Sequence, residues 1–205
     1  MNRWLHSPLK RAIDVVASCV ALVVLSPVLL LIALAVRLRL GSPVLFRQQR
    51  SGLGGESIDV VKFRSMTHAT DRNGVPLSDA ERLTPFGQTL RATSLDELPQ
   101  LWAVLRGDMS LVGPRPLPST YDERYTPEQR RRLEATPGIT GCAQVRGRNS
   151  IDWPTKLAHD VWYVDNASAL LDLTVIWRTA RTVVAGVGVN SDGHATMPEF
   201  TGPDR

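Results

Sequence analysis

Two adjacent carboxylates, Asp96 and Glu97, lie in a stretch (RATSLDELPQ, residues 91–100) where the sequence predicts the start of a helix. Ser94 and Glu97 fit the S-x-x-E spacing of a capping box, but that register places Pro99 inside the helix, where proline clashes. A start at Asp96 or Glu97 avoids the clash and is favoured. The positive end of a helix dipole stabilises ionised carboxylates and attracts phosphate, and an ionised aspartate is a competent nucleophile toward phosphorus. The simpler alternative is that both residues only cap a helix.

Two further stretches contain arginines that could bind an anion. In residues 107–116 (GDMSLVGPRP), two prolines restrict the backbone around Arg115, and a fixed guanidinium matches the geometry of phosphate oxygens. In residues 137–149 (PGITGCAQVRGRN), glycines allow a ligand to approach the backbone closely, and the arginines can bind anions. A structural turn is the alternative for residues 107–116, and neither stretch is decisive by itself.

A long apolar segment precedes these stretches and predicts contact with a membrane. From Ala12 to Val36 the only charged residue in 25 is Asp14, whereas a helix needs roughly 20 residues to cross the hydrocarbon. The apolar region of a signal peptide is shorter, about 7–15 residues, so we expect the segment to be retained. Residues 1–50 carry a net charge of +6, which suits anionic lipid headgroups better than nucleic acid. Asp14 lies near the basic end, where we expect it to pair with Lys10 or Arg11.

Ser26-Pro27 lies near the middle of the apolar segment and predicts a break, because proline inside a helix removes a hydrogen bond and clashes with an earlier carbonyl. A spanning helix with a tolerated kink is one interpretation. Both flanks are basic, however, and a spanning helix leaves most Lys and Arg on the cytoplasmic side. A re-entrant helix-break-helix hairpin, with arms of about 13 residues that are each too short to cross, keeps both basic ends on one face and is favoured.

The rest of the chain predicts a small, mostly helical domain with a short β-hairpin, so the expected fold class is α+β. Strands are expected at Val44–Gln49 and Ile58–Phe63, with a polar loop at 67–80. Helices are expected at about 85–92, 97–106, from Thr126, at about 153–164 and at about 170–185. The expected units are a membrane hairpin at 1–40, an interfacial domain at 41–188 and a frayed tail at 189–205.

Two other features are weaker. Leu170, Leu171, Ile176 and Trp177 give the last helix an apolar stripe, which either packs in the core or lies in the headgroup layer. Cys19 and Cys142 form neither a disulfide framework nor a zinc spacing, and we expect both to be small apolar fillers.

Taken in order, the motifs resemble those of the monotopic phosphoglycosyl transferases of bacteria, the bacterial sugar transferases, in their minimal catalytic form. The likeness covers roughly residues 8–185 and rests on Lys10-Arg11-x-x-Asp14, Ser26-Pro27, 46–52 (FRQQRSG), 62–66 (KFRSM), 91–100, 107–116 and 137–149. Ala103 and Cys142 stand where members commonly carry a larger residue, which bears on the choice of substrate more than on the chemistry.

The resemblance implies a re-entrant helix and a Mg²⁺-dependent, two-step transfer of the EC 2.7.8 type. Asp96 would attack the β-phosphate of a UDP-sugar, releasing UMP and leaving a covalent phosphosugar on the enzyme. Polyprenol (undecaprenyl) phosphate would then accept the sugar phosphate, giving polyprenyl-diphosphate-sugar. Asp96 would also contact the metal, and Glu97 would act as general base or magnesium neighbour. Arg91, Arg115 and Arg148 match family arginines that gather around the phosphates.

The resemblance also implies a place of action, which is the cytoplasmic face of the bacterial inner (plasma) membrane, with membrane lipid as a partner. The reaction would be the first membrane step in making a glycoconjugate such as an exopolysaccharide, O-antigen, capsule or glycoprotein glycan. No residue selects among N-acetylated hexosamines, galactose, glucose and bacillosamine-type sugars. The oligomeric state is open, with a homodimer among the options.

Two other classes of protein were weighed. A membrane-anchored scaffold that has lost its activity would seldom retain Asp96, Glu97 and all three arginines together, and full function of an Asp96→Asn variant would favour it. A nucleic-acid-binding protein would bind DNA in a salt-sensitive way and be recovered without detergent, which the apolar segment argues against. We therefore expect no nucleic-acid partner.

Overall fold

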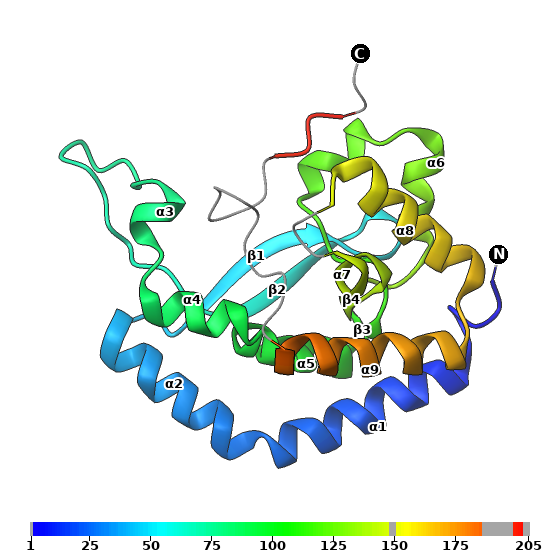
Figure 1. Ribbon diagram of the computed structural model, residues 1–205, viewed down its shortest axis with the longest axis horizontal. Helices are drawn as coiled ribbons and strands as arrows, with labels where there is room; N and C mark the ends of the chain where they lie inside the picture. The colour runs from blue at the N-terminus through cyan, green and yellow to red at the C-terminus, as the bar shows by residue number, and fades with distance from the viewer. Residues whose placement is uncertain (1, 148–150, 186–198, 203–205) are drawn as a thin grey trace.

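The chain begins with two helices that form one bent pair, α1 (Pro8–Val24) and α2 (Ser26–Leu40), in a computed structural model that describes residues 2–147, 151–185 and 199–202 (Figure 1). The Ser7 side chain caps α1 by accepting a hydrogen bond from the N–H of Lys10. The two axes meet at 63°. Pro27 lies in the first turn of α2, where its missing N–H costs little, so the predicted break is confirmed.

Most apolar side chains of the α1–α2 pair face outward. Val16, Val24, Leu30 and Leu38 are 62%, 67%, 72% and 76% exposed. A narrow face of α2 packs on the rest of the protein instead, through Ile32 and Val36 in the hydrophobic cluster of Phe63 and Leu90. No single described helix has both the length and the hydropathy to cross a bilayer, whereas the bent pair meets that test by length and composition.

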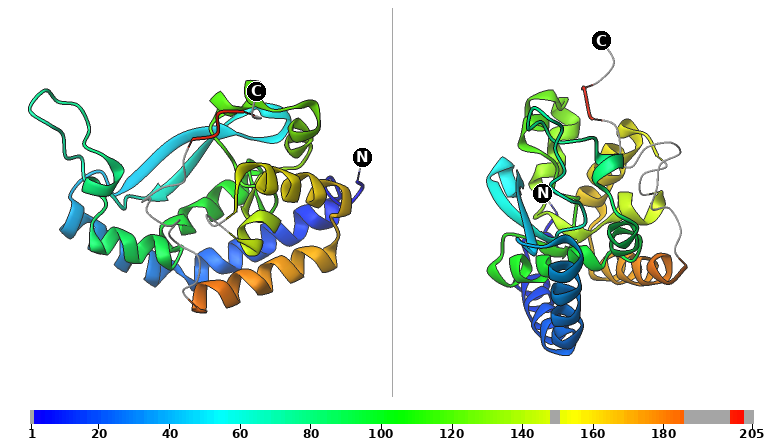
Figure 2. Two further views of the ribbon diagram at one scale, coloured as in Figure 1. Left: turned by 45° about the horizontal axis from the view of Figure 1, so that its top comes forward. Right: turned by 90° about the vertical axis from the view of Figure 1, so that its left-hand side faces the viewer.

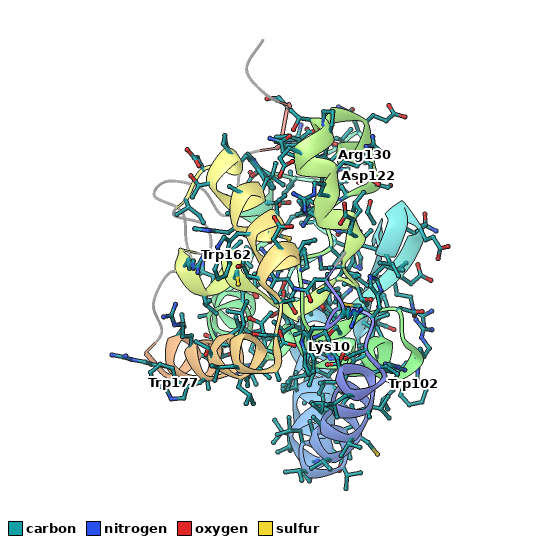
Figure 3. All side chains as sticks on the ribbon, turned by 90° about the vertical axis from the view of Figure 1, so that its right-hand side faces the viewer. Lys10, Trp102, Asp122, Arg130, Trp162 and Trp177 are labelled. Atoms are coloured by element: carbon teal, nitrogen blue, oxygen red, sulfur yellow. The ribbon has the colours of Figure 1, made fainter. Side chains whose placement is uncertain are left out.

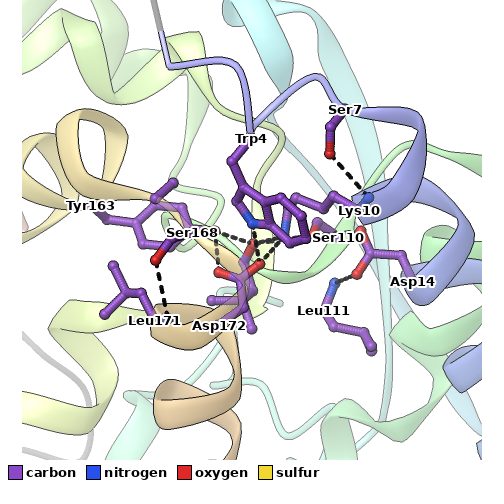
Figure 4. A network of polar contacts seen from close by, with 12 residues as sticks. Trp4, Ser7, Lys10, Asp14, Ser110, Leu111, Tyr163, Ser168, Leu171 and Asp172 are labelled. Atoms are coloured by element: carbon purple, nitrogen blue, oxygen red, sulfur yellow. Dashed lines mark hydrogen bonds and ion pairs between the residues drawn. The ribbon is translucent and has the colours of Figure 1, made fainter.

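A polar network holds the first turns of α1 against the domain (Figure 4). Lys10 forms a buried ion pair with Asp172 at 2.7 Å and donates to the carbonyl of Val112. Asp14 accepts hydrogen bonds from the Ser110 hydroxyl at 2.7 Å and from the Leu111 N–H at 3.1 Å. The expectation that Asp14 pairs with Lys10 or Arg11 is therefore wrong. Asp172 attracts Lys10, and Arg11 donates elsewhere, to the carbonyls of Val104 and Leu105.

The remaining elements build an α+β domain on this hairpin. An antiparallel pair, β1 (Leu45–Ser51) and β2 (Ser57–Phe63) around η1 (Leu53–Gly55), lies above α2 in Figure 1. Then come α3 (Asp79–Arg82), α4 (Pro85–Ala92), η2 (Leu95–Gln100) and α5 (Leu101–Arg106). β3 (Ser110–Val112) and β4 (Gly138–Thr140) pair in parallel. The chain between these two strands forms η3 (Ser119–Arg124), α6 (Pro127–Arg130) and η4 (Arg131–Glu134). The last helices are α7 (Cys142–Arg146), α8 (Trp153–Asn166) and α9 (Ala169–Ala185).

The expected α+β class, the β-hairpin and the helices at 85–92 and 153–164 are confirmed, the last ending two residues later. The helix expected at 97–106 is divided, because the backbone turns as a 3₁₀ helix through Pro99 and becomes α-helical only at Leu101. The helix expected from Thr126 is short and continues as the 3₁₀ helix η4. Short parallel strands such as β3 and β4 leave no alternating pattern, and this pair was not expected.

The hydrophobic core consists of several clusters rather than one. Cys142 lies with Tyr163 and Val175 in one cluster, and Ala103 lies with Val60 and Met109 in another. Cys142 is the expected apolar filler, whereas Cys19 is exposed on α1. Phe200, 2% exposed, packs on aromatic rings of η3 and α8, so the described part of the expected tail, residues 199–202, docks on the domain.

Candidate active site

Asp96 and Glu97 lie in the first turn of η2, shortly after α4 ends at Ala92. Ser94, between the two helices, has a left-handed backbone conformation (φ 56°, ψ 17°). A serine pays a steric penalty for positive φ, and such strained residues cluster at functional sites. The S-x-x-E capping box does not form, since the Glu97 side chain turns toward two cations instead. The favoured start at Asp96 or Glu97 is wrong, because η2 begins at Leu95 with Ser94 as its N-cap residue. Pro99 therefore lies inside the helix, which is a 3₁₀ helix rather than the expected α-helix.

Glu97 is held between a lysine and an arginine. Its Oε1 atom accepts from Lys62 Nζ and from Arg115 Nη2, each at 2.5 Å. Burial alone would raise the pKa of Glu97, but the charges of Arg115 and Lys62 and their hydrogen bonds lower it well below the usual range. Glu97 therefore stays ionised at any pH at which the protein would be assayed, and it fixes the two cations in place.

Asp96 has a different environment. It is 6% exposed. Burial first, and then the negative charge of Glu97, raise its pKa to about 6, against the opposing charges of Lys62, Arg115 and Arg91. The expected effect of the helix end, an ionised carboxylate, is thus partly offset by desolvation. At neutral pH Asp96 is still mostly ionised, and it lies close to the point at which it takes up a proton.

The charges around Asp96 leave a positive excess. Lys62, Arg115 and Arg91 act on it together, against the two carboxylates of Asp96 and Glu97. Arg91 comes from the last turn of α4, and its Nε donates to the Ser65 hydroxyl at 2.9 Å. Burial lowers the pKa of Arg91, a cost that an arriving anion would relieve. A phosphate group is the kind of ligand that such a cluster attracts.

Lys62 is a site residue to which the sequence analysis gave no role. Strand pairing explains its position, because it lies opposite Phe46 and on the same face of the β-hairpin as Val60, which is buried. Burial lowers the pKa of Lys62 while Glu97 raises it. The sequence did contain a signal for Lys62, because a lysine between the apolar residues Val61 and Phe63 of an expected strand is unusual.

Glycines bring the start of the segment that carries Arg115 into close contact with residues 136–141, which include β4. A Cβ atom added to Gly113, Gly138 or Gly141 would lie under 3.0 Å from backbone atoms of the other segment. The glycines of residues 137–149 were expected to let a ligand approach the backbone. Two of them, Gly138 and Gly141, are instead in close contact with the backbone of Gly113. Arg115 is thus presented from a tightly packed double segment.

Of the predicted site residues, Asp96, Glu97, Arg91 and Arg115 are brought together, whereas Arg148 lies outside the described residues. Across residues 2–147, 151–185 and 199–202, no group of three or more His, Cys, Asp or Glu side chains could hold a metal. Mg²⁺ usually binds one or two carboxylates together with substrate phosphates and water. Asp96, on which Lys62, Arg115 and Arg91 act through their charges rather than through hydrogen bonds, fits that pattern.

These residues define an anion-binding site with a buried carboxylate at its centre. The sequence profile of the bacterial sugar transferase family matches residues 5–186. The chain is 48% identical over 194 residues to an uncharacterised sugar transferase, EpsL, of Bacillus subtilis (strain 168), covering 95% of this chain and 96% of the relative. It therefore belongs to the bacterial sugar transferase family.

Two further relatives carry names that state a reaction. The UDP-glucose:undecaprenyl-phosphate glucose-1-phosphate transferase of Caulobacter vibrioides is 43% identical over 185 residues, which are 85% of this chain and 69% of the relative. The undecaprenyl-phosphate galactose phosphotransferase of Salmonella typhimurium is 39% identical over 193 residues, which are 86% of this chain and 40% of the relative. The sugar in these names differs, while the lipid phosphate is the same.

Proposed function

We propose that this chain transfers a sugar 1-phosphate from a UDP-sugar to undecaprenyl phosphate or a similar polyprenol phosphate, giving polyprenyl-diphosphate-sugar and UMP. The observation that carries the proposal is the buried Asp96, next to a carboxylate that organises cations, in a chain of the sugar transferase family. The names of the relatives supply the donor and acceptor classes. Relatives named as exopolysaccharide production proteins support a role at the start of such a polymer.

The first chemical step would use Asp96 as the nucleophile. A carboxylate oxygen forms a bond to the β-phosphorus of the UDP-sugar, and the bond from that phosphorus to the bridging oxygen breaks, so that UMP leaves with the electron pair. Lys62, Arg115 and Arg91 stabilise the charge that develops on the phosphoryl oxygens. A carboxylate with a raised pKa is also a better nucleophile than an ordinary aspartate once it is ionised.

The second step would regenerate Asp96. An oxygen of the lipid phosphate forms a bond to the phosphorus of the phosphosugar, and the bond between Asp96 and phosphorus breaks. One diphosphate replaces another, so no other energy source is needed. Glu97 would act as the fixed anion that holds Lys62 and Arg115, since its hydrogen bonds to both cations leave it poorly placed to accept a proton.

Asp96, together with the phosphates of the donor, would hold Mg²⁺, and the metal would supply charge neutralisation for the leaving UMP. Asp96 is the protein ligand that this arrangement needs. The positive cluster would hold the remaining phosphoryl oxygens, so a single protein carboxylate is enough for the metal.

The attachment of both ends of the α1–α2 pair supports a re-entrant, monotopic placement in the inner membrane. At its start, Lys10 and Asp14 bind the domain through Asp172 and Ser110. At its end, Arg64 of the domain donates to the carbonyls of Leu40 and Ser42. A spanning pair would place these ends on opposite sides of the bilayer, whereas one domain can bind both only when the pair enters and leaves by the same face.

Intact-mass spectrometry tests the proposal with detergent-purified protein, Mg²⁺ and a panel of UDP-sugars that includes glucose, galactose and N-acetylgalactosamine, without lipid acceptor. We expect one donor to add the mass of a sugar phosphate to the protein, with an equal amount of UMP released. Asp96→Asn should show neither, while Asp59→Asn, which changes an exposed carboxylate on β2, should behave like the wild type.

UMP that appears only after undecaprenyl phosphate is added, with no adduct at any time, would replace the covalent route with direct transfer. No UMP from any donor, with or without the lipid, would contradict the proposed function.

A further inference from the structure

The segment that carries Arg115 is held at successive carbonyl oxygens. Residues 114, 116 and 118 are prolines, so they have no N–H with which to pair as a strand. The N–H of Gly138 donates to the carbonyl of Pro114 at 2.9 Å, and the N–H of Ser51 donates to that of Leu117, also at 2.9 Å. Between these two points, the carbonyl oxygen of Arg115 accepts from Arg132 Nη2 at 2.6 Å. A side chain supplies the hydrogen bond nearest to the functional guanidinium.

Arg132 is fully enclosed. It is 2% exposed, and its ion-pair partner Asp160 on α8 is 3% exposed. Asp160 Oδ2 accepts from Arg132 Nε at 3.1 Å and from Nη2 at 2.8 Å. The guanidinium also stands over the ring of Tyr125, and its Nη1 donates to the Tyr125 hydroxyl at 3.4 Å. Asp160 thus fixes the plane of the guanidinium, and that plane directs Nη2 at the backbone of Arg115.

Stability gives a weak reason for such a pair. Removing two charges from water costs free energy that their attraction often fails to return, and a well-packed apolar pair of similar volume is often as stable or more so. The pair contains the donor to the Arg115 carbonyl, and an apolar pair would leave that carbonyl without a partner. The geometry of the Arg132–Asp160 pair therefore fits a role at Arg115 better than a role in stabilising the core alone.

We propose that Arg132, oriented by Asp160, is the positioning residue that sets Arg115 against Glu97 and the donor phosphates. This inference rests on the proposed transferase function. Arg132 touches no reacting atom and acts only through the backbone of Arg115. Its loss would leave the domain folded and displace the Arg115 guanidinium, and small displacements of a catalytic group can slow a reaction by up to about a hundredfold.

A neighbouring ion pair provides a matched control. Arg131 pairs with Asp165, joining the same two elements, η4 and α8, as Arg132 and Asp160. This second pair is on the surface, with side chains 34% and 48% exposed, and Arg131 donates to the carboxylates of Glu128 and Asp165 rather than to Arg115. If a double variant slowed the reaction only by loosening the contact between η4 and α8, then loss of either ion pair should slow it.

The test compares Arg132→Met/Asp160→Leu with Arg131→Met/Asp165→Leu. We expect both double variants to fold, the first with a lower unfolding temperature because the Arg115 carbonyl loses its donor. The rate of UMP release at saturating donor should fall roughly tenfold or more for the first and stay at the wild-type value for the second. A folded Arg132→Met/Asp160→Leu protein with wild-type release would overturn the proposal.

Arg115→Ala closes the thermodynamic cycle. If Arg132 acts only through Arg115, then adding Arg132→Met/Asp160→Leu to Arg115→Ala should cause no further loss of rate. Losses that multiply would mean that the buried pair acts on something else, and the proposal would be wrong.

A readout without turnover separates this inference from the proposed function. In a crystal structure of Arg132→Met/Asp160→Leu, the Arg115 guanidinium should have left Glu97, while the fold is retained. An unchanged ion pair between Arg115 and Glu97 would refute the positioning role even if the wild type released no UMP from any donor. Absence of UMP from the wild type, by contrast, would bear on the proposed function alone.

Discussion

Asp96 and Glu97 are neighbours in the chain, but their surroundings move their pKa values in opposite directions. Glu97 accepts hydrogen bonds from two cations, Lys62 and Arg115, and stays ionised. Asp96 is buried beside that negative charge and has a pKa of about 6. Paired carboxylates whose pKa values are separated in this way commonly divide their roles. Glu97 is occupied with holding the cations, and Asp96 remains available to the substrate.

The raised pKa of Asp96 predicts an acidic limb in the pH dependence of UMP release without acceptor. Only the ionised carboxylate can attack phosphorus, so the rate should be level above pH 7 and fall by about tenfold per unit well below the pKa of about 6. Single-turnover UMP release from about pH 5 to about pH 8 checks this. A rate that stays level down to pH 5 would mean that Asp96 is not titrating as its burial demands.

Lys62→Met tests the cause of that limb. Removing a positive charge disfavours the ionised carboxylate, so the pKa of Asp96 should rise and the acidic limb should move to higher pH. A limb that does not move would show that the limb belongs to another group.

Among the elements, the residues that follow β3 pack closely on residues 136–141, which include β4, just before the chain reaches Arg115. The two strands are only three residues long each and pair in parallel at Ser110–Gly138 and Val112–Thr140. The glycines beside them replace side-chain packing with contact of backbone on backbone. The rigidity of the site therefore depends on the absence of side chains at these positions.

Gly113→Ala is expected to destabilise the protein strongly, because the added Cβ would meet backbone atoms of Thr136, Pro137 and Gly138 that have no rotamer to change. Overpacking typically costs about 1–3 kcal/mol, and we expect the upper end of that range. Gly74→Ala is the control, since Gly74 has a φ of +79° but nothing within 4 Å of an added Cβ, so it should cost only about 1 kcal/mol of backbone strain. Thermal unfolding of both variants measures the difference. Equal losses would contradict the close contact.

How far the sequence leads depends on the element. Hydrophobic alternation and proline placement were enough for the β-hairpin, the break after Leu25 and the helix at 85–92, because these signals are local. The meeting of Asp96, Glu97, Arg91 and Arg115 followed from family resemblance, since nothing local brings residue 115 back to residue 97. Lys62, the glycine contact and the Arg132–Asp160 pair depend on tertiary packing alone, and the arginine run 130–132 gives no sign of which guanidinium is buried.

At the scale of the whole molecule, the α1–α2 pair is attached to the domain at both ends. Asp14 binds Ser110 and the N–H of Leu111, a few residues before Arg115. Arg64, which holds the end of α2, follows Lys62 by two residues. The attachment points of the α1–α2 pair thus lie a few residues along the chain from Arg115 and Lys62, the two cations that hold Glu97. The right-hand view of Figure 2 shows the α1–α2 pair (blue) projecting from the domain to below α9 (orange).

Two tryptophans mark a level on the domain from which the hairpin projects. Trp102 on α5 and Trp177 on α9 are each 60% exposed. Figure 3 shows them at the same level on opposite sides of the hairpin. On α9 the exposed Leu170 and Leu173 extend the apolar surface. Of the two positions considered for the apolar stripe of this helix, the core and the headgroup layer, their exposure favours the headgroup layer. Exposed tryptophans at one level are typical of a membrane interface, where the ring is partly apolar and its N–H stays wet.

Quenching of tryptophan fluorescence by brominated lipids tests this level with single-tryptophan variants in liposomes, all other tryptophans being changed to Phe. Trp102 and Trp177 should be quenched most strongly by bromines placed just below the headgroups, because both rings would lie there. Trp153 is the control, since it packs against Tyr121 and Phe200 in an aromatic cluster and should be quenched weakly. Strong quenching of Trp153, or none of Trp102 and Trp177, would contradict this orientation. Quenching of Trp177 without Trp102 would mean that the domain is tilted, with α9 deeper than α5.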